Sequence, residues 1–209
     1  MSGAVVSRSC RRPECCSCVG AVHAHKGVTI QAVVHVLERM GALIPVLDRV
    51  SSDCRVALEY PHHRRFHPGT VLDETLSAVA LLHGADAVGA LMFSAMQHSL
   101  ESIVAPLARV FLAMKGGGPQ ALLERFELLI GAGAMGFQAA WHAEGANVGR
   151  IVITTDAALP LEADYAWKGT LQYLLVFSKV DGGVTILPRE HDGRACVLRV
   201  SWAAAAKSA

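Results

Sequence analysis

The chain has 209 residues, of which 52% are hydrophobic and 18% are charged, and its formal net charge is +1. A chain of this length and composition can bury a sizeable core, which excludes an intrinsically disordered protein. The near-neutral charge and the aromatic content of 6% argue against nucleic-acid binding, which uses a basic surface and aromatic side chains that stack on bases.

The uncharged runs of the sequence are too short to cross a bilayer. A spanning helix needs roughly 20 apolar residues. The run 128–143 is shorter than that, and Gly131, Gly133 and Gly136 interrupt it. The N-terminus carries arginines but no apolar segment ahead of its cysteines, unlike a secretory signal. We therefore expect a cytoplasmic protein without a membrane span.

Residues 1–26 differ from the remainder, because they hold four of the six cysteines and show no apolar periodicity. Cys15 and Cys18, followed by His23 and His25, are residue types that bind zinc. The histidines follow the cysteines too closely for a zinc finger. The sequence predicts a mobile extension without a metal, and a metal-dependent or thiol-dependent activity at this cluster is the less favoured alternative.

Apolar residues at helical spacing predict that the part from residue 27 to 133 is a helical subdomain. The predicted helices are 27–39, a short helix after Pro45, 70–83, 85–96, 99–114 with Ser99 or Ser102 as its N-cap, and 120–130. The polar, turn-rich stretch 51–69 between them predicts a solvated loop. Cys54 would then be a loop thiol.

The histidines at 62, 63 and 67 are a second candidate metal site. Arg64 and Arg65 stand between them and would repel a cation. The pattern therefore predicts a solvated loop leading into the next helix.

The sequence predicts an α/β subdomain over residues 134–203 and a tail over residues 204–209. Ile151, Ile153 and Thr155 alternate with Arg150, Val152 and Thr154, and this period of two is typical of a strand with one buried face. A helix carrying Trp167 and Leu171 follows, then a hairpin whose turn is Asp192-Gly193. With the strand that begins near Phe137, the order is ββαββ. The predicted fold class is α+β, with a four-stranded antiparallel sheet covered by one helix.

Motifs that resemble catalytic or cofactor sites do not have the required context. Gly131–Gly136 matches G-x-G-x-x-G, but a helix precedes it and a strand follows, which is the reverse of the dinucleotide-binding order. Cys196 lies in an apolar strand and is predicted to be a core thiol. Glu162 and Asp164 are expected to complement a helix N-terminus. The sequence predicts no enzyme, no catalytic residue, no metal ligand and no cofactor, and it does not identify ligand-binding residues.

Several spaced segments resemble a paralogous family of uncharacterised proteins from myxobacteria. They are Arg-Phe-His-Pro-Gly-Thr-Val-Leu-Asp-Glu at 65–74, Ile-Val-Ala-Pro-Leu-Ala-Arg-Val at 103–110, Gly-Gly-Pro-Gln-Ala-Leu-Leu-Glu-Arg-Phe at 117–126, Trp-Lys-Gly at 167–169 and Val-Ser-Trp at 200–202. That family is similar in layout to haem-nitric-oxide-binding domains, four-vinyl-reductase-type sensing domains and transport-particle subunits. The resemblance implies a ligand-sensing or scaffold fold with no reaction attached.

The haem-binding relatives imply features that can be compared with this sequence. Such a relative carries its proximal histidine on the helix before the sheet and a Tyr-x-Ser-x-Arg clamp after it. No histidine occurs between His98 and His142, and the clamp is absent. His83 and His98 are the remaining candidate ligands. Because the proximal histidine and the clamp are both missing, the resemblance does not extend to haem.

The apolar, Gly- and Ala-rich helical half has few polar residues that could converge on one site. This pattern favours a non-enzymatic sensing or signalling module that binds an apolar small molecule in an apolar pocket. The alternative is a protein-interaction scaffold that forms a homodimer through the same surface and has no ligand.

Overall fold

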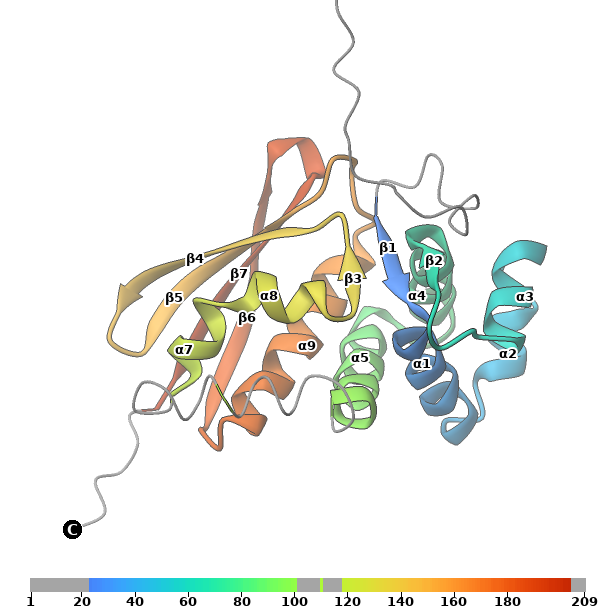
Figure 1. The fold of residues 1–209 in the computed structure, drawn as a ribbon, viewed down its shortest axis with the longest axis horizontal. Helices are drawn as coiled ribbons and strands as arrows, with labels where there is room; N and C mark the ends of the chain where they lie inside the picture. Colours follow the sequence, from blue (N-terminus) through green and yellow to red (C-terminus); the bar gives the residue numbers. More distant parts are fainter. Residues whose placement is uncertain (1–22, 101–109, 111–117, 204–209) are drawn as a thin grey trace, which may run out of the picture.

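The computed structural model describes residues 23–100, 110 and 118–203. Its main sheet consists of β4 (Gln138–Gly145), β5 (Val148–Thr154), β6 (Gly182–Glu190) and β7 (Ala195–Trp202). The strand order is β4-β5-β7-β6, and every neighbouring pair is antiparallel. Helix α9 (Glu162–Phe177) connects β5 to β6 and packs on the sheet (Figure 1). The predicted α+β class and the ββαββ order are confirmed.

The local sequence accounts for these strands and their turn. Ile151, Ile153 and Thr155 are buried, while the residues between them are half-buried, as a period of two requires. The β6–β7 connection passes through the short 3-10 turn η2 (His191–Gly193). Asp192 and Gly193 have φ angles of 55° and 81°, values that favour Gly, Asn and Asp. The predicted hairpin is therefore present.

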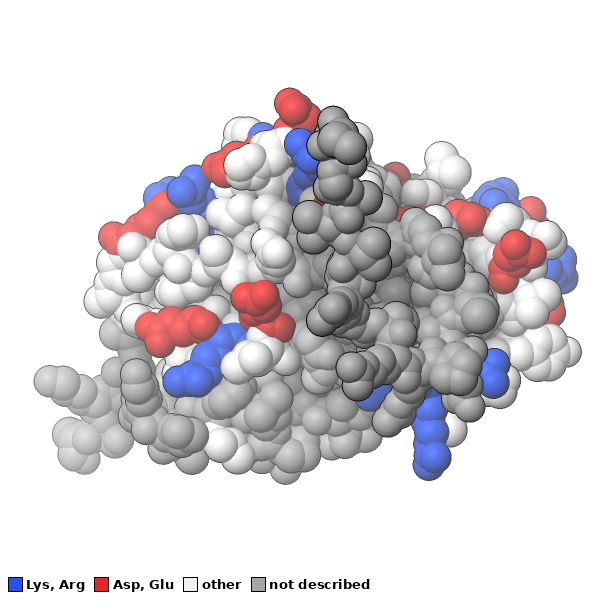
Figure 2. All heavy atoms as spheres, turned by 45° about the horizontal axis from the view of Figure 1, so that its top comes forward, with Lys and Arg blue, Asp and Glu red and all other residues white. Residues whose placement is uncertain are grey.

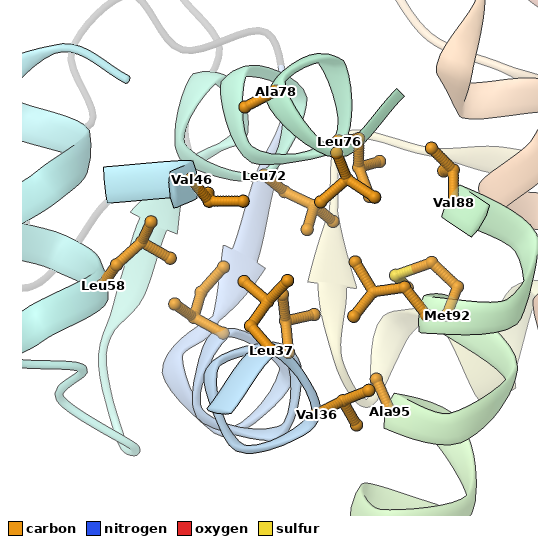
Figure 3. Close-up of a cluster of buried hydrophobic side chains, with 14 of the residues drawn as sticks. Val36, Leu37, Val46, Leu58, Leu72, Leu76, Ala78, Val88, Met92 and Ala95 are labelled. Atoms are coloured by element: carbon orange, nitrogen blue, oxygen red, sulfur yellow. The ribbon is translucent and has the colours of Figure 1, made fainter. Parts of the chain in front are cut away.

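The described residues 23–100 contain five helices that enclose their own core. They are α1 (Gly27–Arg39), α2 (Leu43–Leu47), α3 (Ser52–Glu59), α4 (Gly69–His83) and α5 (Ala85–Leu100). Leu37 of α1, Leu58 of α3, Leu76 of α4 and Met92 of α5 point toward one another in this core (Figure 3). Burying such side chains stabilises the fold by roughly 1.5–3 kcal/mol each.

A small three-stranded sheet joins this helical half to the rest of the chain. It consists of β1 (Ala24–Lys26), β2 (Phe66–Pro68) and β3 (Ala134–Met135), in the order β2-β1-β3. The prediction of a mobile extension reaching residue 26 is therefore wrong at its end, because residues 24–26 pair with two other strands. The first half is also not purely helical. These strands are too short for periodicity to show them.

The prediction of a solvated loop over 51–69 is also wrong, because α3 forms within it. The Ser51 side chain accepts a hydrogen bond from Cys54 N and caps the helix. Cys54 and Leu58, one turn apart, are both buried. The Cys54 thiol lies 3.3 Å from the Val71 carbonyl oxygen of α4, so it is a core thiol rather than a loop thiol.

The predicted helix 120–130 is interrupted. It forms as α7 (Pro119–Leu123) and α8 (Phe126–Gly131), separated by a break at Arg125. Their apolar side chains pack with those of the sheet and α9. The division at residues 133 and 134 stays a prediction, and so does the tail 204–209, which lies outside the described residues. Helix α5 continues to Leu100, so Ser99 is not a cap, and most of the predicted helix 99–114 is likewise outside.

Helices α5 and α9 cross at very close range and hold the two halves together. A Cβ atom placed on Gly169 of α9 would lie 2.1 Å from the Gly89 carbonyl oxygen of α5. Real atoms do not approach so closely, so a larger residue at 169 would push the helices apart. A larger residue fits better at Gly89 of α5, because a Cβ atom there would lie 3.3 Å from the Tyr165 carbonyl oxygen.

The N-terminus of α9 is fixed by one buried arginine on β6. Arg189 Nε donates to Asp164 Oδ2 at 2.8 Å, and both side chains are largely buried. The remaining guanidinium nitrogens donate to the carbonyl oxygens of Leu159, Pro160 and Gly193. The Arg189 side chain thus supplies hydrogen-bond donors to the carbonyl oxygens of the segment that precedes the helix.

The surface carries charges of both signs close together. On the face in Figure 2, Lys and Arg side chains lie beside Asp and Glu side chains. Exposed pairs such as Arg199–Glu144, with 2.7 Å between Nη2 and Oε2, follow this pattern. Within the described residues, no helix has both the length and the apolar character that spanning a bilayer requires.

We predict that Gly169→Ala lowers the free energy of unfolding, measured by urea denaturation, by about 1–3 kcal/mol or more, because the added methyl group overpacks the α5–α9 contact. Gly89→Ala is the matched control and is expected to change stability by less than about 1 kcal/mol, since alanine's helix propensity offsets its tighter contact. Equal effects of the two variants would contradict this account of the crossing.

We predict that Arg189→Met lowers the free energy of unfolding by about 3–5 kcal/mol, because it leaves the Asp164 carboxylate buried without a partner. Arg150→Met removes the exposed Arg150–Glu190 pair, 2.9 Å between Nη1 and Oε1, and is expected to cost about 0–1 kcal/mol. Denaturant titration of both variants measures the difference. A loss of less than 1 kcal/mol at Arg189 would rule out the clamp.

Candidate functional site

An apolar cavity of about 100 Å³ lies between the helical half and the sheet half. It is partly open on one side, and α1, α4, α5, α8 and α9 all contribute to its wall. Its larger apolar lining residues are Val28, Leu72, Leu76, Met92, Met96, Phe126, Leu129, Ile130, Phe137, Leu159, Trp167 and Leu174. Small residues, including Ala163 and Ala166 of α9, leave the space that the larger side chains surround.

Few polar side chains reach this cavity. They are His25, Thr29, Asp73, Ser99 and Thr170. The Thr170 hydroxyl donates to the Ala166 carbonyl oxygen of its own helix at 3.0 Å, so its donor capacity is already used. Asp73 is the only Asp, Glu, Lys or Arg among the described lining residues. The cavity wall is therefore apolar except for these residues, and His25 and Asp73, which both lie beside His23, define what we call its polar end.

His25 is the most buried polar group at that end. Its strand β1 is held on one side by the Lys26 N–H bond to the Gly133 carbonyl oxygen, at 2.7 Å. The ring packs beside Phe137, with 5.5 Å between centroids, and the residue is 7% exposed. Burial, and then the neighbouring His23, lower the pKa of His25 from 6.5 to about 3. The imidazole is therefore neutral at physiological pH.

His25 has no side-chain hydrogen bond to any of the described residues. Its ring packs against the rings of His23 and Phe137. A neutral imidazole has one donor nitrogen and one acceptor nitrogen. Neither nitrogen is among the fully buried side-chain atoms that lack a partner, so both can be reached from the cavity that His25 lines.

His23 lies beside His25 and is seated on the first turn of α4. Its carbonyl oxygen accepts from Gly69 N at 2.9 Å, and a Cβ on Gly69 would lie 2.1 Å from its ring. Its Nε2 is 3.2 Å from Asp73 Oδ2. The distance fits an ion pair, but no hydrogen bond forms, so Nε2 has no hydrogen-bond partner among the described residues. Gly69 and Asp73 together place His23 at the polar end.

The structure describes only some of the candidate metal-ligating residues. Cys15 and Cys18 lie outside the described residues, so the predicted Cys/His cluster is not tested. In the parts of the chain that are described, no group of three His, Cys, Asp or Glu side chains could hold an ion. His67 pairs with His25 across β1 and β2, and burial lowers its pKa.

The other sequence motifs have structural roles. Helix α8 ends at Gly131, β3 (Ala134–Met135) lies within the glycine motif and β4 follows it, which confirms that a helix precedes the motif and a strand follows. Gly136 has φ 80°, which favours glycine, whereas a Cβ atom on Gly131 would meet open space. Cys196 is a buried core thiol, as predicted; burial raises its pKa, as does Asp164 beside it, so it is a poor nucleophile.

The two histidines considered as haem ligands do not line the cavity. His98 is exposed and stacks on His35 of α1, with 4.3 Å between ring centroids, and His83 is exposed at the end of α4. Sequence reasoning missed His25 and Asp73 as residues of one site. The only signal was the alternation Val22-His23-Ala24-His25, which is too short to predict a strand.

Solved structures with the same fold are H-NOX domains. An H-NOX protein from K. algicida, in its Fe(II) unliganded form, is 10% identical with a TM-score of 0.66, over 86% of this chain and 97% of that one. A structure that probes the function of heme distortion in the H-NOX family is 12% identical to this chain with a TM-score of 0.56, and the match covers 85% of this chain and 94% of that one.

An oxygen-binding H-NOX domain related to soluble guanylate cyclases, solved as its oxygen complex, is 12% identical with a TM-score of 0.54, over 85% and 94% of the two chains. No protein-family model and no curated protein matches the chain. At this level of identity the likeness establishes the fold: the chain has an H-NOX-like layout over most of its length.

We predict that acidification destabilises the protein through His25. The folded protein keeps this imidazole neutral down to a pKa of about 3, whereas the unfolded chain takes up the proton below pH 6.5, so acid favours unfolding. Stability is complete above pH 6.5 and falls by up to about 1.4 kcal/mol per pH unit below it. Denaturant titrations from pH 7 to 4 measure this slope.

His25→Phe is the variant that isolates this effect, because every other titrating group is retained. Its free energy of unfolding is expected to fall less steeply with acid than that of the original protein. Parallel pH profiles of the two proteins would show that His25 is not buried in its neutral form.

Proposed function

We propose that this protein is a non-enzymatic sensing module that binds a small apolar molecule in the cavity between its two halves. The observation that carries the proposal is the cavity itself. Its wall is almost entirely apolar, and both hydrophobic clusters contribute to it. Apolar pockets between structural units are common sites for small ligands, which gain free energy there by leaving water.

The location of the cavity also suggests how binding could be reported. Leu72, Leu76 and Met92 belong to the helical half, whereas Phe126, Trp167 and Leu174 belong to the cluster of the sheet. A ligand that contacts both sets favours one spacing of the halves over others. A difference in affinity between two arrangements is what shifts their populations. The α5–α9 contact is the point about which such a shift would turn.

The H-NOX neighbours make haem a candidate ligand, because one of them is described in an Fe(II) form and another in terms of heme distortion. The described lining does not fit this group. Its volume of about 100 Å³ is below the roughly 300–1,000 Å³ typical of sites for drug-sized ligands, and a porphyrin needs a space of that order. No Lys or Arg among the described lining residues would pair with the two propionates. The proposal is therefore a ligand other than haem.

No reaction is part of the proposal. The buried thiols of Cys54 and Cys196 have pKa values raised by burial, so they are poor nucleophiles. The homodimer, the cytoplasmic location and the relationship to the myxobacterial family stay predictions.

Methionine-methyl NMR provides a direct test of binding. Met92 and Met96 line the cavity, whereas Met40 is half-exposed at the end of α1. We predict that benzene shifts the methyl signals of Met92 and Met96 saturably and leaves that of Met40 unchanged. A cavity of about 150 Å³ is known to accept benzene. This cavity, of about 100 Å³, is smaller but partly open to its surroundings.

Two alanine variants control the benzene titration. Ala163→Leu fills the cavity and is expected to weaken benzene binding by at least tenfold. Ala90→Leu adds the same atoms at an exposed position of α5 and should leave binding unchanged. The absence of any saturable shift, or a stoichiometric haemin complex with an intense Soret band, would contradict the proposed function.

A further inference from the structure

The polar end of the cavity restricts the chemistry of the ligand, and this argument rests on the proposed function. His25 is buried to more than nine-tenths, lines the cavity and has no hydrogen bond from its ring to the described residues. Neither ring nitrogen is among the fully buried atoms that lack a partner, so a molecule in the cavity can reach them. A ligand that carries a hydrogen-bonding group can therefore pair with this ring.

The charges around the cavity exclude an anionic ligand. Asp73 is the only charged side chain among the described lining residues, and its carboxylate would repel a carboxylate or a phosphate. No lysine or arginine among those residues offsets this repulsion. The ligand therefore has no negative charge.

A cationic ligand is disfavoured for a different reason. The carboxylate that could pair with it already faces His23, with 3.2 Å between Asp73 Oδ2 and His23 Nε2. The rest of the wall is apolar, and placing an ammonium group against it costs several kcal/mol of desolvation. A neutral molecule meets neither penalty.

The two ring nitrogens of His25 define the hydrogen-bonding group. In the neutral form one nitrogen donates and the other accepts, so a hydroxyl group can bind to either of them. A hydrocarbon would leave the ring unpaired. The cavity volume of about 100 Å³ restricts the body of the ligand to roughly the size of one six-membered ring.

We propose that the cavity binds a neutral, apolar molecule of about the size of benzene that carries one hydroxyl group, and that this hydroxyl hydrogen-bonds to the His25 ring. Phenol represents this class, benzene is the same body without the hydroxyl, and benzoate adds a negative charge. Binding is measured for each probe from the methyl signals of Met92 and Met96.

Phenol is expected to bind about fivefold or more tightly than benzene, which corresponds to one net hydrogen bond, and benzoate is expected to bind more weakly than either. In His25→Phe, which keeps a ring at this position, the preference for phenol should fall to about one while benzene still binds. His83→Phe changes an exposed histidine of α4 and should keep the preference.

The outcomes separate this proposal from the proposed function. If benzene binds but phenol binds no better, or if His25→Phe keeps the preference for phenol, the hydroxyl–His25 bond is wrong and the apolar cavity stands. If benzoate binds as tightly as phenol, the neutral class is wrong. If no probe shifts the two methyl groups, the cavity is not a ligand site. A change in the ¹⁵N chemical shifts of the His25 ring with phenol, and not with benzene, is the expected direct signature.

Discussion

The close contact between α5 and α9 is the constraint on which the remainder of the structure depends. Gly89 and Gly169 face each other with no room for a side chain on the α9 member, so the two helix axes are brought as near as backbones allow. Because α9 also packs on the main sheet, this contact fixes the distance between the helical half and the sheet (Figure 1). Beyond it, larger side chains keep the halves apart, and the cavity is the space they do not fill.

The cavity wall is unusual in its distribution of polar groups rather than in its apolar character. Apolar side chains from both clusters meet there, as they would in any core. The histidines and Asp73 are confined to one end, where β1 lies beside α4. The apolar cavity is the basis for proposing a ligand, and the His25 ring that lines it is the basis for proposing a hydroxyl group on that ligand.

Much of the fold follows from local signals that the sequence displays clearly. The alternation around Ile151 and the Asp192-Gly193 turn predict the strands and hairpin that form, and the stripe containing Leu171 predicts α9. Helix α3 had a readable signal as well, since Ser51 caps it and Cys54 and Leu58 lie one turn apart, but the polar residues around them concealed it.

The site could not be predicted in the same way, because nothing local connects its members. His25 and Asp73 are far apart in the chain, and β1 and β2 are three residues each, too short for a period of two to register. The cavity itself results from helices and strands that meet only in the folded protein. Its apolar character could be anticipated from the Gly- and Ala-rich composition, but not its position or its polar end.

The small sheet has a consequence for the order in which the chain folds during synthesis. β1 pairs with β2 early, but its other edge is completed only by Ala134 and Met135, which emerge from the ribosome much later. A nascent chain that has not reached β3 leaves one side of β1 open, and such edges invite pairing with other chains. The helical half is therefore most vulnerable to aggregation during translation of the segment that precedes Ala134.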